Sequence, residues 1–182
     1  YFPQYDFPEL RAALSSAMTQ GDPRELLKLL DQRISREPEG RYTDNSSDAF
    51  YAVSCLDLPV TQSVDQVREF AERLAISAPT FGKSLGWGVL ACKDWPYSAQ
   101  TVITITPNTS APVMLVTAEN DPATPAKWAT DVAVKLGNAE LVIWEGGYNH
   151  TAYLEGSDCV TDRVDAYLLE GIISPGTTTT CN

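Results

Sequence analysis

Two short apolar runs with a helical pattern between them characterise the second half of the chain. Residues 113–116 and 141–144 have the length of strands and are mostly aliphatic or aromatic, whereas 127–136 carries apolar residues at helical spacing. This order predicts a strand–helix–strand unit with parallel strands and a right-handed crossover. We therefore expect an α/β fold class for this part of the chain.

The first half of the chain has the periodicity of helices instead. Apolar residues recur at helical spacing over 10–17. Asp22 followed by Pro23 is typical of a helix start, and a leucine-rich run follows it. Residues 48–55 and 64–74 predict two further helices.

A change in composition after 95–97 suggests where the two halves meet. β-branched residues become dominant at 101–105. We therefore divide the chain into a helical lid or cap region at 1–99 and a carboxyl-terminal α/β segment at 100–182. An all-helical lid of this kind would cover the catalytic edge of a sheet.

Two candidate catalytic residues follow the predicted strands. Asp121 comes shortly after 113–116, and His150, the chain's only histidine, comes shortly after 141–144. Polar residues just beyond parallel strands face one crevice, so we expect both at the same edge of the sheet. A carboxylate on one imidazole nitrogen fixes the tautomer that takes a serine proton with the other nitrogen, and Asp before His is the α/β-hydrolase order. Asp121 also suits a turn or helix cap, and a lone histidine also suits a structural role.

Motifs around these residues and along most of the chain resemble one family. They are similar to secreted α/β-hydrolases related to tripeptidyl aminopeptidase, and they lie at 17–22, 55–59, 92–96, 121–125, His150, 156–159, 167–168, 171–177 and Cys181. The resemblance implies a helical lid followed by the carboxyl-terminal strands and helices of an α/β-hydrolase sheet. It also implies a serine exopeptidase that releases short peptides from substrate amino termini, with relatives that act on other amides or esters.

The resemblance further implies that the nucleophilic serine lies outside these 182 residues. In the family this serine sits on a strand-to-helix elbow in an amino-terminal half, whereas this chain opens in what resembles the lid. We therefore expect a carboxyl-terminal portion of the enzyme that supplies Asp121 and His150 and is inactive by itself.

One serine within the chain fits the usual nucleophile motif but not its context. Ser84 lies at the centre of a Gly-x-Ser-x-Gly sequence at 82–86. The motif requires a buried strand that leads into its first glycine, but Pro79 breaks the preceding run, and a helix is predicted before it. Too few residues separate Ser84 from Asp121 for the strand and helix expected between nucleophile and acid. We expect Ser84 not to be the nucleophile.

Charge and hydropathy narrow the classes of partner. A chain of 182 residues that is 43% hydrophobic can bury a substantial core. Its net charge of −11 argues against nucleic acids and anionic membranes as partners. No apolar run reaches the length of a membrane span.

The four cysteines favour disulfides over a metal site. None forms a Cys-x-x-Cys pair, and a single histidine accompanies them, so neither a metal nor another cofactor is expected. Four cysteines allow three pairings. The family pattern implies that Cys55 pairs with Cys92 and that Cys159 pairs with Cys181. Disulfides also indicate a secreted, extracellular protein.

The sequence leaves two alternatives to an exopeptidase open. A partial sheet leaves an exposed edge strand, which the amino-terminal half of the same enzyme or a second copy of the chain would cover. The chain could therefore be a non-catalytic lid or interaction module instead of part of an enzyme. Within the enzymes, an esterase or lipase-type hydrolase is the alternative to a peptidase with a peptide substrate.

Overall fold

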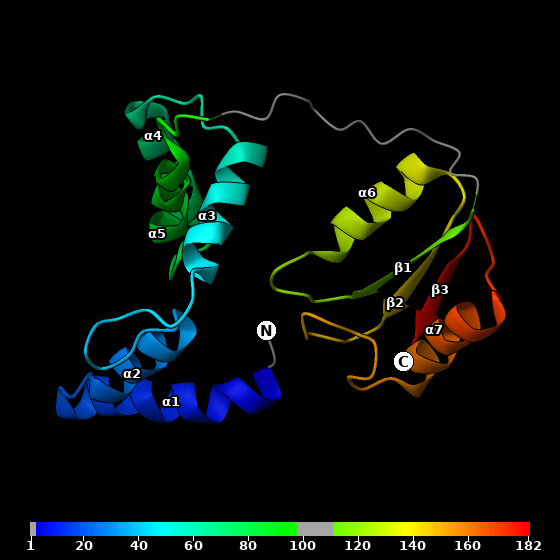
Figure 1. Cartoon of the computed structure of the whole chain (residues 1–182), viewed down its shortest axis with the longest axis horizontal. Helices are drawn as coiled ribbons and strands as arrows, with labels where there is room; N and C mark the ends of the chain where they lie inside the picture. Colours follow the sequence, from blue (N-terminus) through cyan, green and yellow to red (C-terminus); the bar gives the residue numbers. More distant parts are fainter. Residues whose placement is uncertain (1–2, 98–110) are drawn as a thin grey trace. The chain divides into compact units, whose positions relative to one another are not determined.

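The computed structural model describes residues 3–97 and 111–182 (Figure 1). The chain divides into two compact units, Leu27–Val102 and a second unit that combines Tyr1–Leu26 with Ile103–Asn182. The helices are α1 (Pro3–Gln20), α2 (Arg24–Arg33), α3 (Ser46–Asp57), α4 (Val64–Ser77), α5 (Gly82–Gly88), the 3₁₀ helix η1 (Val89–Cys92), α6 (Ala126–Leu136) and α7 (Asp158–Glu170).

Within the described residues, three parallel strands form the sheet, in the order β1 (Val113–Ala118), β2 (Ala139–Trp144) and β3 (Thr178–Cys181). Helix α6 connects β1 to β2 and packs against both strands. The structure therefore confirms the predicted strand–helix–strand unit and the α/β fold class. The third strand was not predicted, because its threonine-rich sequence has no apolar alternation.

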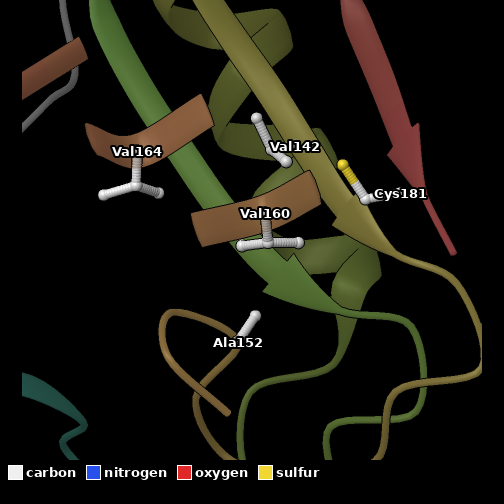
Figure 2. Packing of buried hydrophobic residues seen from close by; sticks show 5 residues of the cluster. All are labelled: Val142, Ala152, Val160, Val164 and Cys181. Atoms are coloured by element: carbon white, nitrogen blue, oxygen red, sulfur yellow. The ribbon is translucent and has the colours of Figure 1, made fainter. Parts of the chain in front are cut away.

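Helix α7 packs on the sheet through its buried valines. Val160 and Val164 lie over Val142 of β2, and Ala152 and Cys181 complete this buried cluster (Figure 2). Figure 2 also shows α6 behind the sheet, on the face opposite α7. Strand β2 is consequently covered on both faces, which explains why an almost continuous apolar run is the right sequence for it.

A buried carboxylate fastens β3 and the segment before it to this core. The side chain of Glu140 on β2 is fully buried, and it accepts hydrogen bonds from Arg163, from Ser174 N–H at 2.6 Å and from Thr179 Oγ1 at 3.1 Å. Burial alone would raise the pKa of Glu140, but the bonds from Ser174, Arg163 and Thr179 together lower it below its usual value. The disulfide Cys159–Cys181 ties the same strand to α7, as the family resemblance implied.

The unit Leu27–Val102 includes helices α3, α4 and α5 and the 3₁₀ helix η1. It also contains a disulfide. Cys55 of α3 pairs with Cys92 of η1, which confirms the second implied pairing. Helix α4 begins with a capping box, in which Ser63 and Gln66 bond each other's backbone N–H groups. The predicted helices at 48–55 and 64–74 are confirmed as α3 and α4.

Two features of the predicted organisation fall outside the described residues. The run of β-branched residues at 101–105 and the boundary between 99 and 100 both lie within 98–110, which the structure does not describe. The division into a lid at 1–99 and an α/β segment at 100–182 therefore stays a prediction. Across the described ranges, no helix is both long and apolar enough to cross a bilayer.

Candidate active site

Asp121 and His150 are in direct contact. His150 Nδ1 lies 3.1 Å from both carboxylate oxygens of Asp121. Only 6% of the Asp121 side chain is exposed, whereas 34% of the His150 side chain is exposed. The pair therefore combines a buried carboxylate with an imidazole that is partly open to solvent. Whether the two residues are catalytic stays a prediction.

Asp121 is held by the loop that follows β1, here called the aspartate loop (119–124). Its Oδ1 accepts the backbone N–H groups of Ala123 at 2.8 Å and Thr124 at 2.9 Å, and its Oδ2 accepts the Thr124 hydroxyl at 2.8 Å. Burial would raise the pKa of Asp121, but the hydrogen bonds from Thr124, Ala123 and His150 hold it below its usual value. The carboxylate is therefore stabilised in its charged form, as a group that supports an imidazolium must be.

Thr124 is a part of this site that we did not single out from the sequence. Its hydroxyl oxygen lies 3.5 Å from His150 Nδ1 as well as within bonding distance of Asp121. The signal was present in the Asp-Pro-Ala-Thr-Pro motif, since an Asp three residues before a Thr can bond both its N–H and its hydroxyl. The turn-forming role of Asp121 and its contact with the histidine are therefore compatible.

The loop after β2, here called the histidine loop (145–150), carries His150. It begins with a tight turn in which Gly146 has a φ of +70°. Gly147 then passes so close to the Trp144 ring that an added Cβ would lie 2.3 Å from ring atom Cδ2. Glycine meets both requirements without strain, so these two residues favour the path by which the chain leaves the strand.

Asn149, the residue just before His150, is a buried polar side chain. It is 1% exposed, and its Oδ1 has no hydrogen-bond partner within the described part of the chain. Asn149 anchors the backbone next to His150 in the interior. The histidine side chain, in contrast, reaches the surface.

The Gly-x-Ser-x-Gly sequence around Ser84 has a structural explanation. It lies inside helix α5, not on a strand-to-helix elbow, and Ser84 is exposed. Gly82 and Gly86 are buried on the opposite side, where an added Cβ would lie 2.3 Å from the Leu74 carbonyl oxygen and 2.6 Å from Ala71 Cα. The glycines therefore allow α5 to approach α4, and they do not shape a nucleophile turn.

Residue types that commonly bind metals do not gather in the described parts of the chain. Within 3–97 and 111–182 no cluster of three or more His, Cys, Asp and Glu side chains is arranged to hold an ion. All four cysteines are used in the two disulfides. What the site contains is a carboxylate–imidazole pair that can accept and return a proton.

The chain is similar to three kinds of hydrolase. It is 33% identical to Carboxylesterase B of Mycobacterium tuberculosis over 91% of this chain and 32% of that protein. It is 34% identical to Serine protease Hip1 of the same organism, over 82% of this chain and 29% of that protein. It is also 26% identical to Tripeptidyl aminopeptidase of Streptomyces lividans, over 88% of this chain and 30% of that protein.

The chain thus spans about a third of the length of the curated relatives it matches. No solved structure matches it significantly. The family model described as TAP-like protein matches residues 78–181, which is more than half of the chain. This chain belongs to the TAP-like family, and its parallel sheet is the carboxyl-terminal part of an α/β-hydrolase fold.

Proposed function

We propose that the chain supplies the acid and the base of a Ser-His-Asp triad in a serine hydrolase. The observation that carries this proposal is the 3.1 Å distance from His150 Nδ1 to both oxygens of the buried Asp121 carboxylate. When Nδ1–H donates to Asp121, the other ring nitrogen is left as the base. Similarity to hydrolases over most of the chain supports the same assignment.

In the proposed mechanism the nucleophile comes from outside these 182 residues. A serine attacks the scissile carbonyl while His150 takes its proton, and His150 then returns that proton to the leaving group. Asp121 orients the ring and stabilises the imidazolium that forms. Backbone N–H groups of the part of the enzyme that carries this serine would form the oxyanion hole.

The substrate that we propose is a peptide, from whose amino terminus the enzyme releases short peptides. Similarity to Tripeptidyl aminopeptidase and to Serine protease Hip1 supports this choice. Ester hydrolysis is the second candidate, because the chain is 33% identical to Carboxylesterase B. Both reactions pass through an acyl-enzyme, so the same acid–base pair would serve either one.

We also propose that the protein is secreted and that its main partner is the amino-terminal part of the same enzyme. Two disulfides within a chain of this size favour an oxidising compartment. Strand β1 is hydrogen-bonded only to β2 among the described strands, and we propose that a strand of the amino-terminal part pairs with its other edge. A non-catalytic docking module would use the same edge, and it is the alternative outside the enzymes.

The test compares substrates on an enzyme in which this chain is joined to an amino-terminal half that carries the serine. Release of p-nitroaniline from a tripeptide anilide and of p-nitrophenol from a short ester separates a peptidase from an esterase. His150→Gln and Asp121→Asn should each lower kcat by about 10⁴-fold, since either change removes the correctly oriented base. Ser84→Ala is the matched control and should leave kcat unchanged.

Three results would count against the proposal. Full activity of His150→Gln would exclude the triad assignment, and loss of activity in Ser84→Ala would place the nucleophile on α5. A folded, assembled protein that hydrolyses neither substrate and does not react with a fluorophosphonate would favour the non-catalytic module.

A further inference from the structure

Besides the contacts of Asp121 and Thr124 with His150, three hydrogen bonds join the aspartate loop to the end of β2 and to the histidine loop. Two are between backbone groups: Glu119 N–H donates to the Trp144 carbonyl at 3.0 Å, and Asn120 N–H donates to the Gly147 carbonyl at 2.8 Å. The third uses a side chain, because Gly146 N–H donates to Glu119 Oε2 at 2.7 Å. Glu119 therefore contacts the histidine loop at the glycine turn where that loop begins.

We propose that Glu119 is a positioning residue, whose carboxylate fixes the Gly146 turn and so keeps His150 within hydrogen-bonding distance of Asp121. A bond from a backbone N–H to a charged carboxylate is stronger than a bond between two neutral groups. The glycine at the turn has few conformational restraints of its own, so an external bond is needed to select one orientation. The inference rests on the proposed function for its catalytic meaning, but not for its test.

A neighbouring carboxylate provides a matched comparison. Glu145 belongs to the same turn, is exposed, and carries the same charge. Its backbone N–H donates to the Cys181 carbonyl, but the structure gives its carboxylate no hydrogen bond among the described residues. Removing either side chain changes the net charge equally, but only Glu119 accepts the Gly146 N–H among the described residues.

The chain's single histidine makes the experiment direct. Ring nitrogens of ¹⁵N-histidine-labelled chain give one set of signals, and the signals of the neutral ring report its tautomer. In the unmodified chain we expect the Nδ1–H tautomer, because Asp121 accepts that proton. In Glu119→Ala the ratio of Nδ1–H to Nε2–H tautomers should fall by about threefold to tenfold, the range for the net contribution of one hydrogen bond at an exposed site.

Three further variants complete the test. Glu119→Gln keeps an acceptor oxygen without the charge and should retain most of the original tautomer ratio, whereas Glu119→Leu keeps the bulk without the acceptor and should behave like Glu119→Ala. Glu145→Ala should leave the spectrum unchanged. Circular dichroism establishes that each variant is folded. If Glu119→Ala cannot be obtained folded, the contrast between Glu119→Leu and Glu119→Gln decides the question.

The outcomes separate this inference from the proposed function. An unchanged histidine spectrum in Glu119→Ala or Glu119→Leu would overturn the positioning role. A shift in Glu119→Gln as large as that in Glu119→Ala would also overturn it, since the acceptor oxygen would then not matter. A shifted tautomer without any loss of turnover in the complete enzyme would support the positioning role and contradict the proposed triad.

Discussion

Thr124 Oγ1 donates a hydrogen bond to Asp121 Oδ2 over 2.8 Å, and the same oxygen lies 3.5 Å from His150 Nδ1. This hydrogen bond restrains rotation of the Asp121 carboxylate about its Cβ–Cγ bond. The backbone bonds to Oδ1 hold the other oxygen, so the two sets of contacts together define the plane in which the imidazole can bind.

Thr124→Val should therefore lower kcat of the assembled enzyme by about tenfold and leave KM nearly unchanged, because one bond to a charged group is lost. Thr124→Ser keeps the hydroxyl and should retain most of the activity. Thr130→Val is the control, since among the described residues the Thr130 hydroxyl bonds the Ala126 carbonyl of its own helix. Steady-state kinetics measure the effect, and equal kcat for all three variants would show that the backbone bonds suffice.

Gly147→Ala should destabilise the fold by about 1–3 kcal/mol, because the new methyl group overlaps the Trp144 ring and one of them must move. Urea unfolding followed by circular dichroism measures this loss. Gly88→Ala is the opposite case, since Gly88 has helical dihedral angles and open space at its Cβ position. That variant should be unchanged or up to about 1 kcal/mol more stable, as expected for alanine in a helix.

Acid should destabilise the α/β unit through Asp121 and Glu140. Both pKa values are lower in the folded chain than for free carboxyl groups, so both groups contribute stability above their ordinary values of 3.8 and 4.5. This contribution is lost as the pH falls through the lower, folded pKa values. We expect the free energy of unfolding to decrease steadily as the pH falls below about 4.5.

Glu140→Gln isolates one part of this acid dependence. The variant removes one titrating group, so its free energy of unfolding should depend less steeply on pH in the acid range. At neutral pH it should also be less stable by about 2–4 kcal/mol, because Arg163 loses its buried partner. Urea unfolding at a series of pH values measures both effects. An identical slope for Glu140→Gln and the unmodified chain would contradict the account of Glu140.

Loss of the Cys159–Cys181 disulfide should release β3. The bond closes a segment with a sequence separation of 22, for which chain entropy predicts a loss of roughly 3 kcal/mol. A Cys159→Ser/Cys181→Ser double variant, compared with the unmodified chain in urea, measures it. Limited proteolysis should then cut within 171–180 first. A double variant that resists proteolysis there would show that Glu140 holds the segment without help.

The parts of the fold that could be predicted from the sequence are those with a local signal. Helix α6 and strands β1 and β2 have distinct hydrophobic periods, and parallel pairing of the two strands brings their following loops to one edge. The contact between Asp121 and His150 follows from that geometry. The disulfide pairings came from the family resemblance, since spacing alone left three possibilities open.

The parts that could not be predicted depend on distant partners. Strand β3 is polar, and it is held by its ladder with β2, the bonds to Glu140 and the disulfide. A glutamate inside a buried strand has no sequence signal until Arg163 and Ser174 are placed beside it. Helix α5 was not predicted, because glycine is unfavourable inside a helix. Here Gly82 and Gly86 allow α5 to pack closely against α4.

Strand β3 changes the dynamics expected of the strand that leads to His150. Because β2 pairs with β1 on one side and with β3 on the other, its amide protons are protected along both edges. Hydrogen–deuterium exchange at 141–144 should require opening of the whole sheet, whereas exchange in the histidine loop needs only local opening. The strand before the histidine loop should therefore exchange slowly, whereas the loop that carries His150 should exchange faster because it can open by itself.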